Sequence, residues 1–340
     1  ATASDPRGRP CFRRRQSCAM IDVIIPVAAK DYPKLGRCLS ATLRNSRTRI
    51  GTMYLIAADD GALAFLDAAS ASRVVIVREC EMPFRKRDIE AVLEEQGATA
   101  KQASWYYQQL LKFYVFEVIP KLAVHVLILD ADFIFCKPIS FLTDDGRAFL
   151  SRGYPFRWLI NTRDYPARVD HVHADFARRF VAGWEPVEPF SGMHHHMVFA
   201  RHILAELFAV VERQHRQPFW RAFAETVRLE KWNAASEFVL YYHYAMARHP
   251  GCVVVRNLKT CDIIHDSEAG DGALEALDRQ LASGEFDAVG CHAFLGLEAR
   301  IQTMDYIPHD LRSDLASVQD GMFRLLLDNA MLQVDLYARG

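Results

Sequence analysis

The chain contains 340 residues, of which 51% are hydrophobic and 24% are charged, and its formal net charge is −1. This length suits one large domain or two fused lobes, and the apolar content is ample for a sizeable core. The near-neutral charge gives no indication of nucleic acid as a partner, and the chain lacks the run of about 18 uncharged apolar residues that a transmembrane helix requires.

Eight cysteines are scattered along the chain, and no two of them form a CxxC pair. Because zinc sites usually draw on such pairs, we expect no zinc site. Disulfide scaffolds are typical of small secreted domains, so reduced thiols in a cytoplasmic enzyme fit this long apolar chain better. We also expect no secretory leader, because the first residues lack the apolar core of a signal peptide.

Residues 1–20 are predicted to form a disordered basic extension. Arg7, Arg9 and the three arginines at 13–15 lie among Pro, Gly and Ser, with little apolar surface to bury. Such arginines can bind anionic lipid headgroups, which would place the protein at the inner face of a membrane as a peripheral contact. An extension without a role is the alternative.

The first ordered half is predicted to alternate strands and helices. Residues 21–27 form an apolar run that suits a buried strand, residues 28–45 a helix, and residues 52–58 and 73–77 two more strands. This order indicates βαβ units, and therefore an α/β fold with a Rossmann-like, mainly parallel sheet. No GxGxxG follows the first strand, which argues against a dinucleotide-binding domain, and no GxxxxGK[ST] phosphate loop is present.

Two helices are expected next, at residues 84–97 and 103–122, and the second is apolar almost all the way round. Its polar residues Gln108, Gln109 and Lys112 therefore stand out as candidates for diphosphate binding. Gln108 and Lys112 are four residues apart, on one helical face, and a lysine near the carboxyl edge of the sheet could neutralise a diphosphate. A solvated polar face on a core helix is the alternative.

Residues 125–129 form an apolar strand that ends in Asp130 and Asp132. An extended chain places residues i and i+2 on the same side, so the two carboxylates are expected to face one way at the carboxyl end of the sheet, where open α/β sheets bind ligands. A hard divalent cation, Mg²⁺ or Mn²⁺, shared with a phosphate would offset their charge. A strand followed by a capping Asp in a turn is the alternative.

Six sequence blocks along the chain carry a resemblance to known enzymes. They are DVIIPV, WYYQQLLK, LDADFIF followed by KP, MHHHMVF, ASEFVLY and AVGCHAF. Together they resemble the GT-A-fold nucleotide-sugar glycosyltransferases. They are similar to a bacterial group of such enzymes, and more distantly to the glycogenin and lipopolysaccharide galactosyltransferase family. The resemblance covers roughly residues 21–300.

The resemblance implies a nucleotide-sugar donor and a metal site in which Asp130 and Asp132 hold Mn²⁺ or Mg²⁺ against the diphosphate. It also implies that His292 completes this site, and His265 is the rival for that role. The HxxGxxKPW block of the glycogenin-like family is absent, which leaves the third metal ligand and the stereochemistry open.

The second half contributes candidates for acceptor or sugar binding. Residues 145–190 are irregular and rich in Arg, Pro and aromatic residues, as acceptor loops or lids often are. His195 and His196 precede a short strand at 197–199, and alternation would point His194 and His196 one way and His195 the other. Their ring nitrogens suit the recognition of sugar hydroxyls, whereas buried core histidines or a metal site are the alternatives.

Further helices are expected at 201–213 and 217–229, and Ser236 is expected to cap a helix that begins at Glu237. Ser236 is also a candidate for acceptor or sugar binding. The helix dipole stabilises a carboxylate in the first turn of a helix, and this stabilisation alone can explain why an acid stands at Glu237. In several inverting GT-A enzymes an acid at such a position removes the acceptor proton, so Glu237 is the candidate general base. A strand at 251–256 follows.

A helix at 274–282 and an amphipathic helical tail at 311–337 complete the expected elements. The tail would pack on the core, or serve as a membrane-surface or dimer face. The resulting division is a basic extension at 1–20, a nucleotide-sugar-binding half at 21–142, an acceptor-binding half at 143–305 and a helical tail at 306–340.

The predicted function is a metal-dependent glycosyltransferase that moves a sugar from a nucleotide-sugar donor to a glycan or glycolipid acceptor, with inversion if Glu237 is the base. Three alternatives stay open. They are a retaining enzyme of the same fold, a sugar-phosphate nucleotidyltransferase that releases pyrophosphate, and a non-catalytic module that binds glycans or nucleotides.

Overall fold

The computed structural model describes residues 20–153, 172–188, 190–229, 234–263, 284 and 286–291. A five-stranded sheet with strand order β3-β2-β1-β4-β7 lies at its centre. All neighbouring strands in it are parallel except β7, which is antiparallel to β4. The prediction of a mixed, mainly parallel α/β sheet is confirmed. The strands are β1 (Met20–Pro26), β2 (Arg49–Ala57), β3 (Val74–Arg78), β4 (His125–Leu129) and β7 (His196–Ala200).

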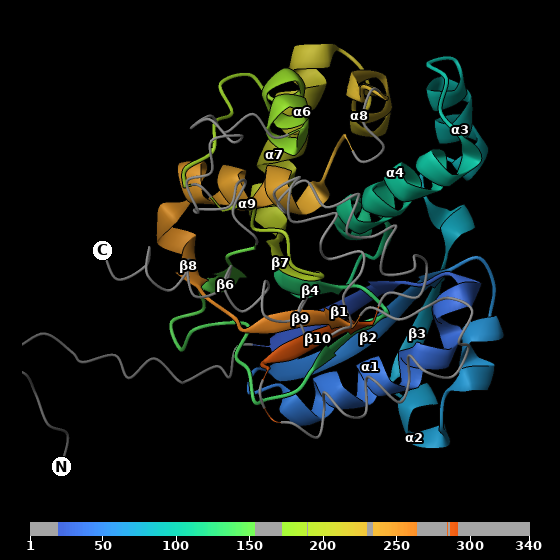
Figure 1. The fold of residues 1–340 in the computed structure, drawn as a ribbon, viewed down its shortest axis with the longest axis vertical. Helices are drawn as coiled ribbons and strands as arrows, with labels where there is room; N and C mark the ends of the chain where they lie inside the picture. Colours follow the sequence, from blue (N-terminus) through green and yellow to red (C-terminus); the bar gives the residue numbers. More distant parts are fainter. Residues whose placement is uncertain are drawn as a thin grey trace, which may run out of the picture.

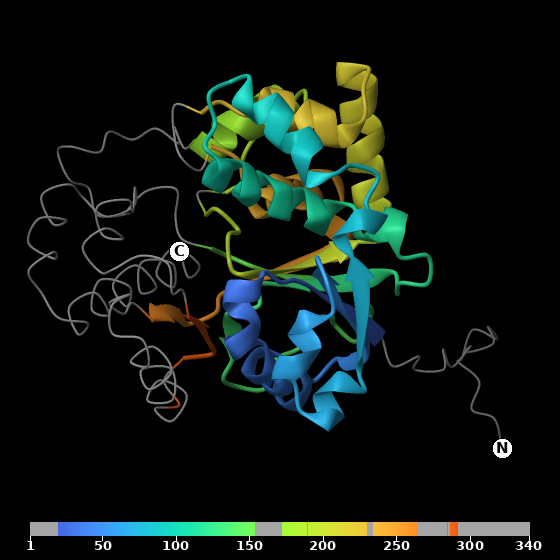
Figure 2. The same cartoon turned by 90° about the vertical axis from the view of Figure 1, so that its right-hand side faces the viewer.

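Helices cover both faces of this sheet, which is why β1 and β4 are apolar on both sides. Figures 1 and 2 show α1 and α2 on one side, and α4, α7, α8 and α9 on the other. The helices are α1 (Tyr32–Asn45), α2 (Ala68–Ala71), α3 (Lys86–Glu94), α4 (Ala100–Phe113), α5 (Val115–Val118), α6 (Val172–Phe180), α7 (Arg201–His215), α8 (Phe219–Thr226) and α9 (Glu237–Arg248).

One buried carboxylate in β1 serves the sheet itself. Asp22 is 4% exposed, and its two oxygens accept hydrogen bonds from the backbone N–H groups of Thr52, at 2.8 Å, and Ala123, at 2.7 Å. These bonds lie where the β1–β2 register shifts between Ile21 and Val23. Asp22 therefore satisfies donors that an irregular ladder would otherwise leave unpaired.

Two smaller sheets accompany the central sheet (Figure 1). Because β5 begins directly after Asp132, the chain leaves the central sheet at the acidic pair. The strands of the first small sheet are β5 (Phe133–Phe135), β10 (Ala288–Cys291) and β9 (Thr260–Ile263), and those of the second are β6 (Ala148–Ser151) and β8 (Val253–Arg256).

Three predicted elements need correction. The long helix expected at 103–122 is instead α4, which begins at Ala100 and ends at Phe113, followed by the short α5. Pro120 explains the end of α5, because it disfavours a helical conformation at Ile119 (φ −108°, ψ 98°). The segment 145–190, predicted to be irregular, contains β6 and α6 in its described parts. The strand expected at 251–256 begins at Val253, after a 3₁₀ turn.

Other expected elements fall outside the part of the chain that the structure describes. These are residues 1–19 of the basic extension, the helix at 274–282 and the tail at 311–337. Among the described residues, no helix is long and apolar enough to cross a membrane.

The loop before β7 depends on one glycine. Gly192 has a φ of +69°, and a Cβ on it would collide with the ring of Tyr242, which is fully buried on α9. Only glycine satisfies both constraints, because an L side chain is disfavoured at this φ and has no room. This close approach places the following histidines, His194 to His196, against the sheet.

Gly192→Ala is expected to lower the free energy of unfolding by more than about 3 kcal/mol, since it combines left-handed strain with overpacking. Gly183→Ala is the matched control, because Gly183 has a φ of +73° but a Cβ added to it would meet nothing within 4 Å. The control should lose only about 1–2 kcal/mol. Urea denaturation of both variants measures the difference, and equal losses would show that the contact with Tyr242 is unimportant.

Candidate functional site

A cavity of about 420 Å³ opens at the carboxyl ends of β1 and β4. The two strands are parallel, with Ile24 opposite Ile128, so their ends meet at one edge of the sheet. The cavity is lined by the turns after β1 and β4, by α4, and by residues after β3 and at the start of α3. Its charged and polar residues include Lys30, Asp31, Glu79, Lys86, Lys101, Gln108, Asp130, Asp132 and His195.

A turn, rather than an extended strand, carries Asp130 and Asp132 to this cavity. The N–H of Asp130 donates to the carbonyl of His195 at 2.9 Å, which continues the β4–β7 ladder by one residue. The N–H of Phe133 then donates back to the carbonyl of Asp130 at 3.1 Å and closes the turn. Both carboxylates line the cavity. The expected placement is therefore correct, although the expected extended geometry is wrong.

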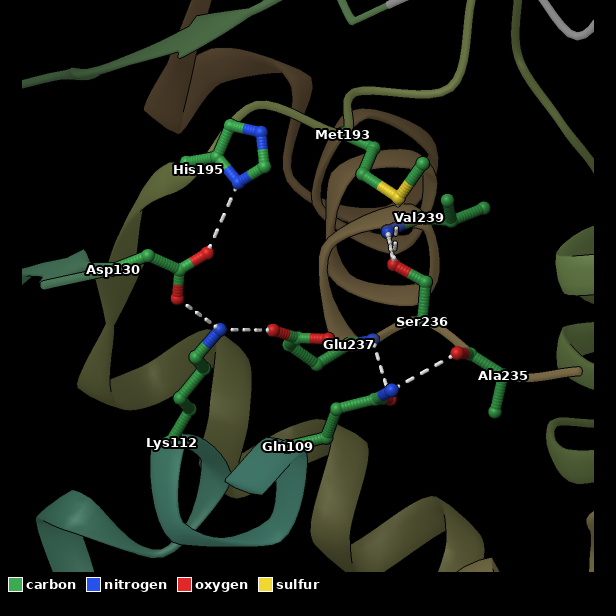
Figure 3. A network of polar contacts seen from close by, with 9 residues as sticks. All are labelled: Gln109, Lys112, Asp130, Met193, His195, Ala235, Ser236, Glu237 and Val239. Carbon is green, nitrogen blue, oxygen red and sulfur yellow. Dashed lines mark hydrogen bonds and ion pairs between the residues drawn. The ribbon is translucent and has the colours of Figure 1, made fainter. Parts of the chain in front are cut away.

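Behind the cavity wall, a buried lysine lies between two carboxylates (Figure 3). Lys112 Nζ is 2.7 Å from Asp130 Oδ1 and 2.6 Å from Glu237 Oε1, and it also lies 4.4 Å from the centre of the Phe238 ring. The lysine side chain is 4% exposed and that of Glu237 5%. On its other oxygen, Asp130 contacts His195 Nδ1 at 3.2 Å. One chain of polar contacts thus joins α4, β4, β7 and α9.

The pKa shifts follow from this arrangement. Burial alone would raise the pKa of Asp130, but Lys112 and His195 hold it well below its usual range. Burial would lower the pKa of Lys112, and its two carboxylate partners instead raise it. Burial raises the pKa of Glu237, which Lys112 only partly offsets. Lys112 is therefore charged and is ion-paired with both carboxylates.

Gln109 and Ser236 support the start of α9 instead of facing the cavity. Gln109 Nε2 donates to the carbonyl of Ala235 at 3.0 Å, and Gln109 Oε1 accepts from the N–H of Glu237 at 3.1 Å. Ser236 Oγ accepts from the N–H of Val239 at 3.3 Å, so the predicted N-cap is confirmed. Neither residue is among those that line the cavity, and neither is Lys112 or Glu237.

The histidine run divides as strand alternation predicts. His195 lines the cavity, whereas His194 and His196 are 4% and 2% exposed. His196 stacks on Phe133 and contacts Ser151 Oγ through Nε2 at 3.3 Å, and burial holds its pKa well below the usual value. Sugar contact is thus open to His195 in this geometry, while His196 is a core residue.

Sequence reasoning missed Asp31, which lies in the turn after β1 and lines the cavity. Its pKa is raised, first by burial and then by the charge of Asp132, although Lys30 and Lys34 lie 4.0 and 3.8 Å from it. The position just after the first strand of a parallel sheet was a usable signal, because all such turns meet at the ligand-binding edge. Lys86, Lys101 and Trp105 were also missed as lining residues.

Asp31 and Asp132 are the candidate ligands for a hard divalent cation in this cavity. Burial raises the pKa of Asp31 and the charge of Asp132 adds to this effect, and carboxylate oxygens are the ligands that Mg²⁺ and Mn²⁺ prefer. Asp130 is held by Lys112 and His195 on its two oxygens, which makes it a weaker candidate ligand. His292 and His265, the predicted completing ligands, lie outside the described residues.

A scan of protein-family models found no match to the chain, and a search of curated proteins found no significantly similar sequence.

Lys112→Met is expected to lower the free energy of unfolding by about 3–5 kcal/mol, because it leaves the buried Glu237 and the partly buried Asp130 without their cation. The double variant Lys112→Met/Glu237→Gln should lose less than the single variant, since it removes one of the stranded charges. Urea denaturation measures both.

Lys86→Met is the matched control, because Lys86 lines the same cavity but is 47% exposed and pairs with Glu90 at 3.6 Å. It should cost less than about 1 kcal/mol. A Lys112→Met variant as stable as this control would show that the buried pairing contributes little.

Proposed function

We propose that the protein is a metal-dependent glycosyltransferase of the GT-A type, which transfers a sugar from a nucleotide-sugar donor to a glycan or glycolipid acceptor. The observation that supports this most is the mixed charge of the cavity. Asp31, Asp130 and Asp132 line it on the sheet side, and the same cavity is lined by Lys30, Lys86 and Lys101. A phosphate group would offset the charge of the lysines, and a divalent cation would offset the charge of the acids. A ligand that brings both together therefore suits this cavity.

A nucleoside diphosphate sugar meets these requirements. The lysines would offset the charge of the diphosphate, while the carboxylates would hold the cation that the diphosphate shares. Trp105 and Tyr107 add aromatic surface to the same cavity, on which a flat base can pack. The cavity volume of about 420 Å³ lies in the range of small-molecule sites.

Asp132 and Asp31 would hold the cation, with Asp130 oriented beside them by Lys112. When bound, Mn²⁺ or Mg²⁺ would act as a Lewis acid that offsets charge on the departing diphosphate. The Lys112–Asp130 pair would keep the turn after β4 in one position as the donor binds. Lys112 itself would act on the diphosphate only through Asp130, because it is not among the lining residues.

The stereochemistry depends on which group takes the acceptor proton. Glu237 is the candidate from the sequence, but its carboxylate is buried, ion-paired with Lys112 and absent from the lining residues. His195 lines the cavity and is held through Nδ1 by Asp130 Oδ2. An imidazole oriented by a carboxylate is a suitable general base, so an inverting reaction would use His195 in preference to Glu237.

Asp132→Asn is expected to abolish Mn²⁺-dependent donor binding while the protein remains folded. Thermal-shift measurements with UDP-, GDP-, CMP- and dTDP-sugars, with and without Mn²⁺, should give one donor that raises the melting temperature of the wild type. A donor at 100 times its dissociation constant adds about 2.7 kcal/mol of stability. Asp145→Asn is the matched control, because Asp145 is exposed and lies outside the cavity.

The control should bind the donor as the wild type does. The nucleotide product then identifies the reaction, since a glycosyltransferase releases a nucleoside diphosphate. Release of pyrophosphate from a nucleoside triphosphate and a sugar phosphate would instead identify a nucleotidyltransferase. Donor binding that is unchanged in Asp132→Asn would contradict the proposed site.

A further inference from the structure

A second group of metal-ligating side chains lies outside the cavity. His202 is near the start of α7, His249 follows the end of α9, and Cys252 ends the 3₁₀ turn that leads into β8. One ligand atom from each of the three lies within 4.8 Å of the other two. None of them lines the cavity, so this group is independent of the proposed donor site.

The local backbone brings His249 and Cys252 together. They enclose Pro250 and Gly251 in a turn in which the N–H of Cys252 donates to the carbonyl of His249 at 2.9 Å. This is the two-residue spacing that paired zinc ligands commonly have. His202 reaches the pair from α7, with its ring edge-on to that of His249 at 5.3 Å between centroids.

The distances suit a tetrahedral ion after small side-chain rotations. Bonds of about 2.0–2.3 Å to nitrogen and sulfur place tetrahedral ligand atoms roughly 3.3–3.8 Å apart. The three ligand atoms lie within 4.8 Å of one another, so each has to move by no more than about one ångström. His202 is exposed, while His249 and Cys252 are half-buried, so an ion can enter from solvent and the thiol is accessible.

A carboxylate is already placed to orient one ligand. Glu206 Oε2 lies 2.9 Å from His249 Nε2, and Glu206 Oε1 accepts from Tyr244 at 3.0 Å and from Arg248 at 3.2 Å. Histidines that bind metals usually hydrogen-bond a carboxylate through their other ring nitrogen, which fixes the ring. Glu206 lies close enough to His249 to take this orienting role once the ring has turned toward an ion.

We propose that His202, His249 and Cys252 bind Zn²⁺ and that the ion ties the start of α7 to the end of α9. Two imidazoles and a thiolate favour zinc over Mg²⁺ or Mn²⁺, which prefer oxygen. Three protein ligands leave one coordination position for water. Cys252 binds as the thiolate, so its proton is released to the buffer on binding. The absence of a CxxC pair predicts no zinc site, but these ligands meet only in the folded chain.

The test uses the full chain, freed of metal by chelation and titrated with Zn²⁺ alone. The wild type should bind one zinc per chain by calorimetry and elemental analysis, and its melting temperature should rise with zinc. Cobalt substitution should add a thiolate-to-metal charge-transfer band. Cys252→Ser should abolish that band and weaken zinc binding at least tenfold, and His202→Ala should weaken it similarly.

Cys80→Ser is the control, because Cys80 is an exposed free thiol far from the cluster in sequence and outside it in space. This variant should bind zinc and cobalt as the wild type does. The proposal is overturned if the wild type binds no stoichiometric zinc, or if the Cys252→Ser/His202→Ala double variant binds it with wild-type affinity. His202 is exposed, so its replacement by alanine tests binding without a large effect on folding.

Discussion

The single positive charge of Lys112, buried between Asp130 and Glu237, is the constraint on which the site depends. Three charged groups leave water at this point, and the cost is acceptable only because the lysine is 2.7 and 2.6 Å from its two partners. The pairing connects α4 to the turn after β4 and to the first turn of α9. Because Lys112 occupies one oxygen of Asp130, only the rest of that carboxylate can face the cavity. The same lysine holds Glu237 away from the cavity.

This arrangement divides the acids of the site by role. Asp130 is neutralised by Lys112 and in turn holds His195, so it orients the cavity wall. Asp132 and Asp31 come from turns after two neighbouring parallel strands, and their charges act on each other. The cavity thus combines several carboxylates with several lysines, and a cation that shares a diphosphate would offset both kinds of charge.

The sheet and the position of the acidic pair could be predicted from the sequence because both depend on local patterns. Apolar runs at β1 and β4 and the residues that follow them indicate a carboxyl edge without any tertiary knowledge. The pairing of Lys112 with Glu237 could not be predicted from local patterns, because the two residues are 125 positions apart. In addition, the helix dipole alone explains a carboxylate in the first turn of a helix. The strand β6 was missed because its partner β8 lies far along the chain, with Ala148 opposite Val253. Asp31 follows β1 at the same edge, so its position could have been used in the same way as that of Asp130 and Asp132.

The most direct test of this account is anomalous scattering from crystals grown with Mn²⁺ and a nucleoside diphosphate. The account predicts a manganese peak within bonding distance of Asp132, on the side of the cavity that Asp31 faces, with Lys112 still between Asp130 and Glu237. A nucleotide bound in the cavity without manganese beside Asp132, or a manganese ion bonded to Glu237 in place of Lys112, would contradict it.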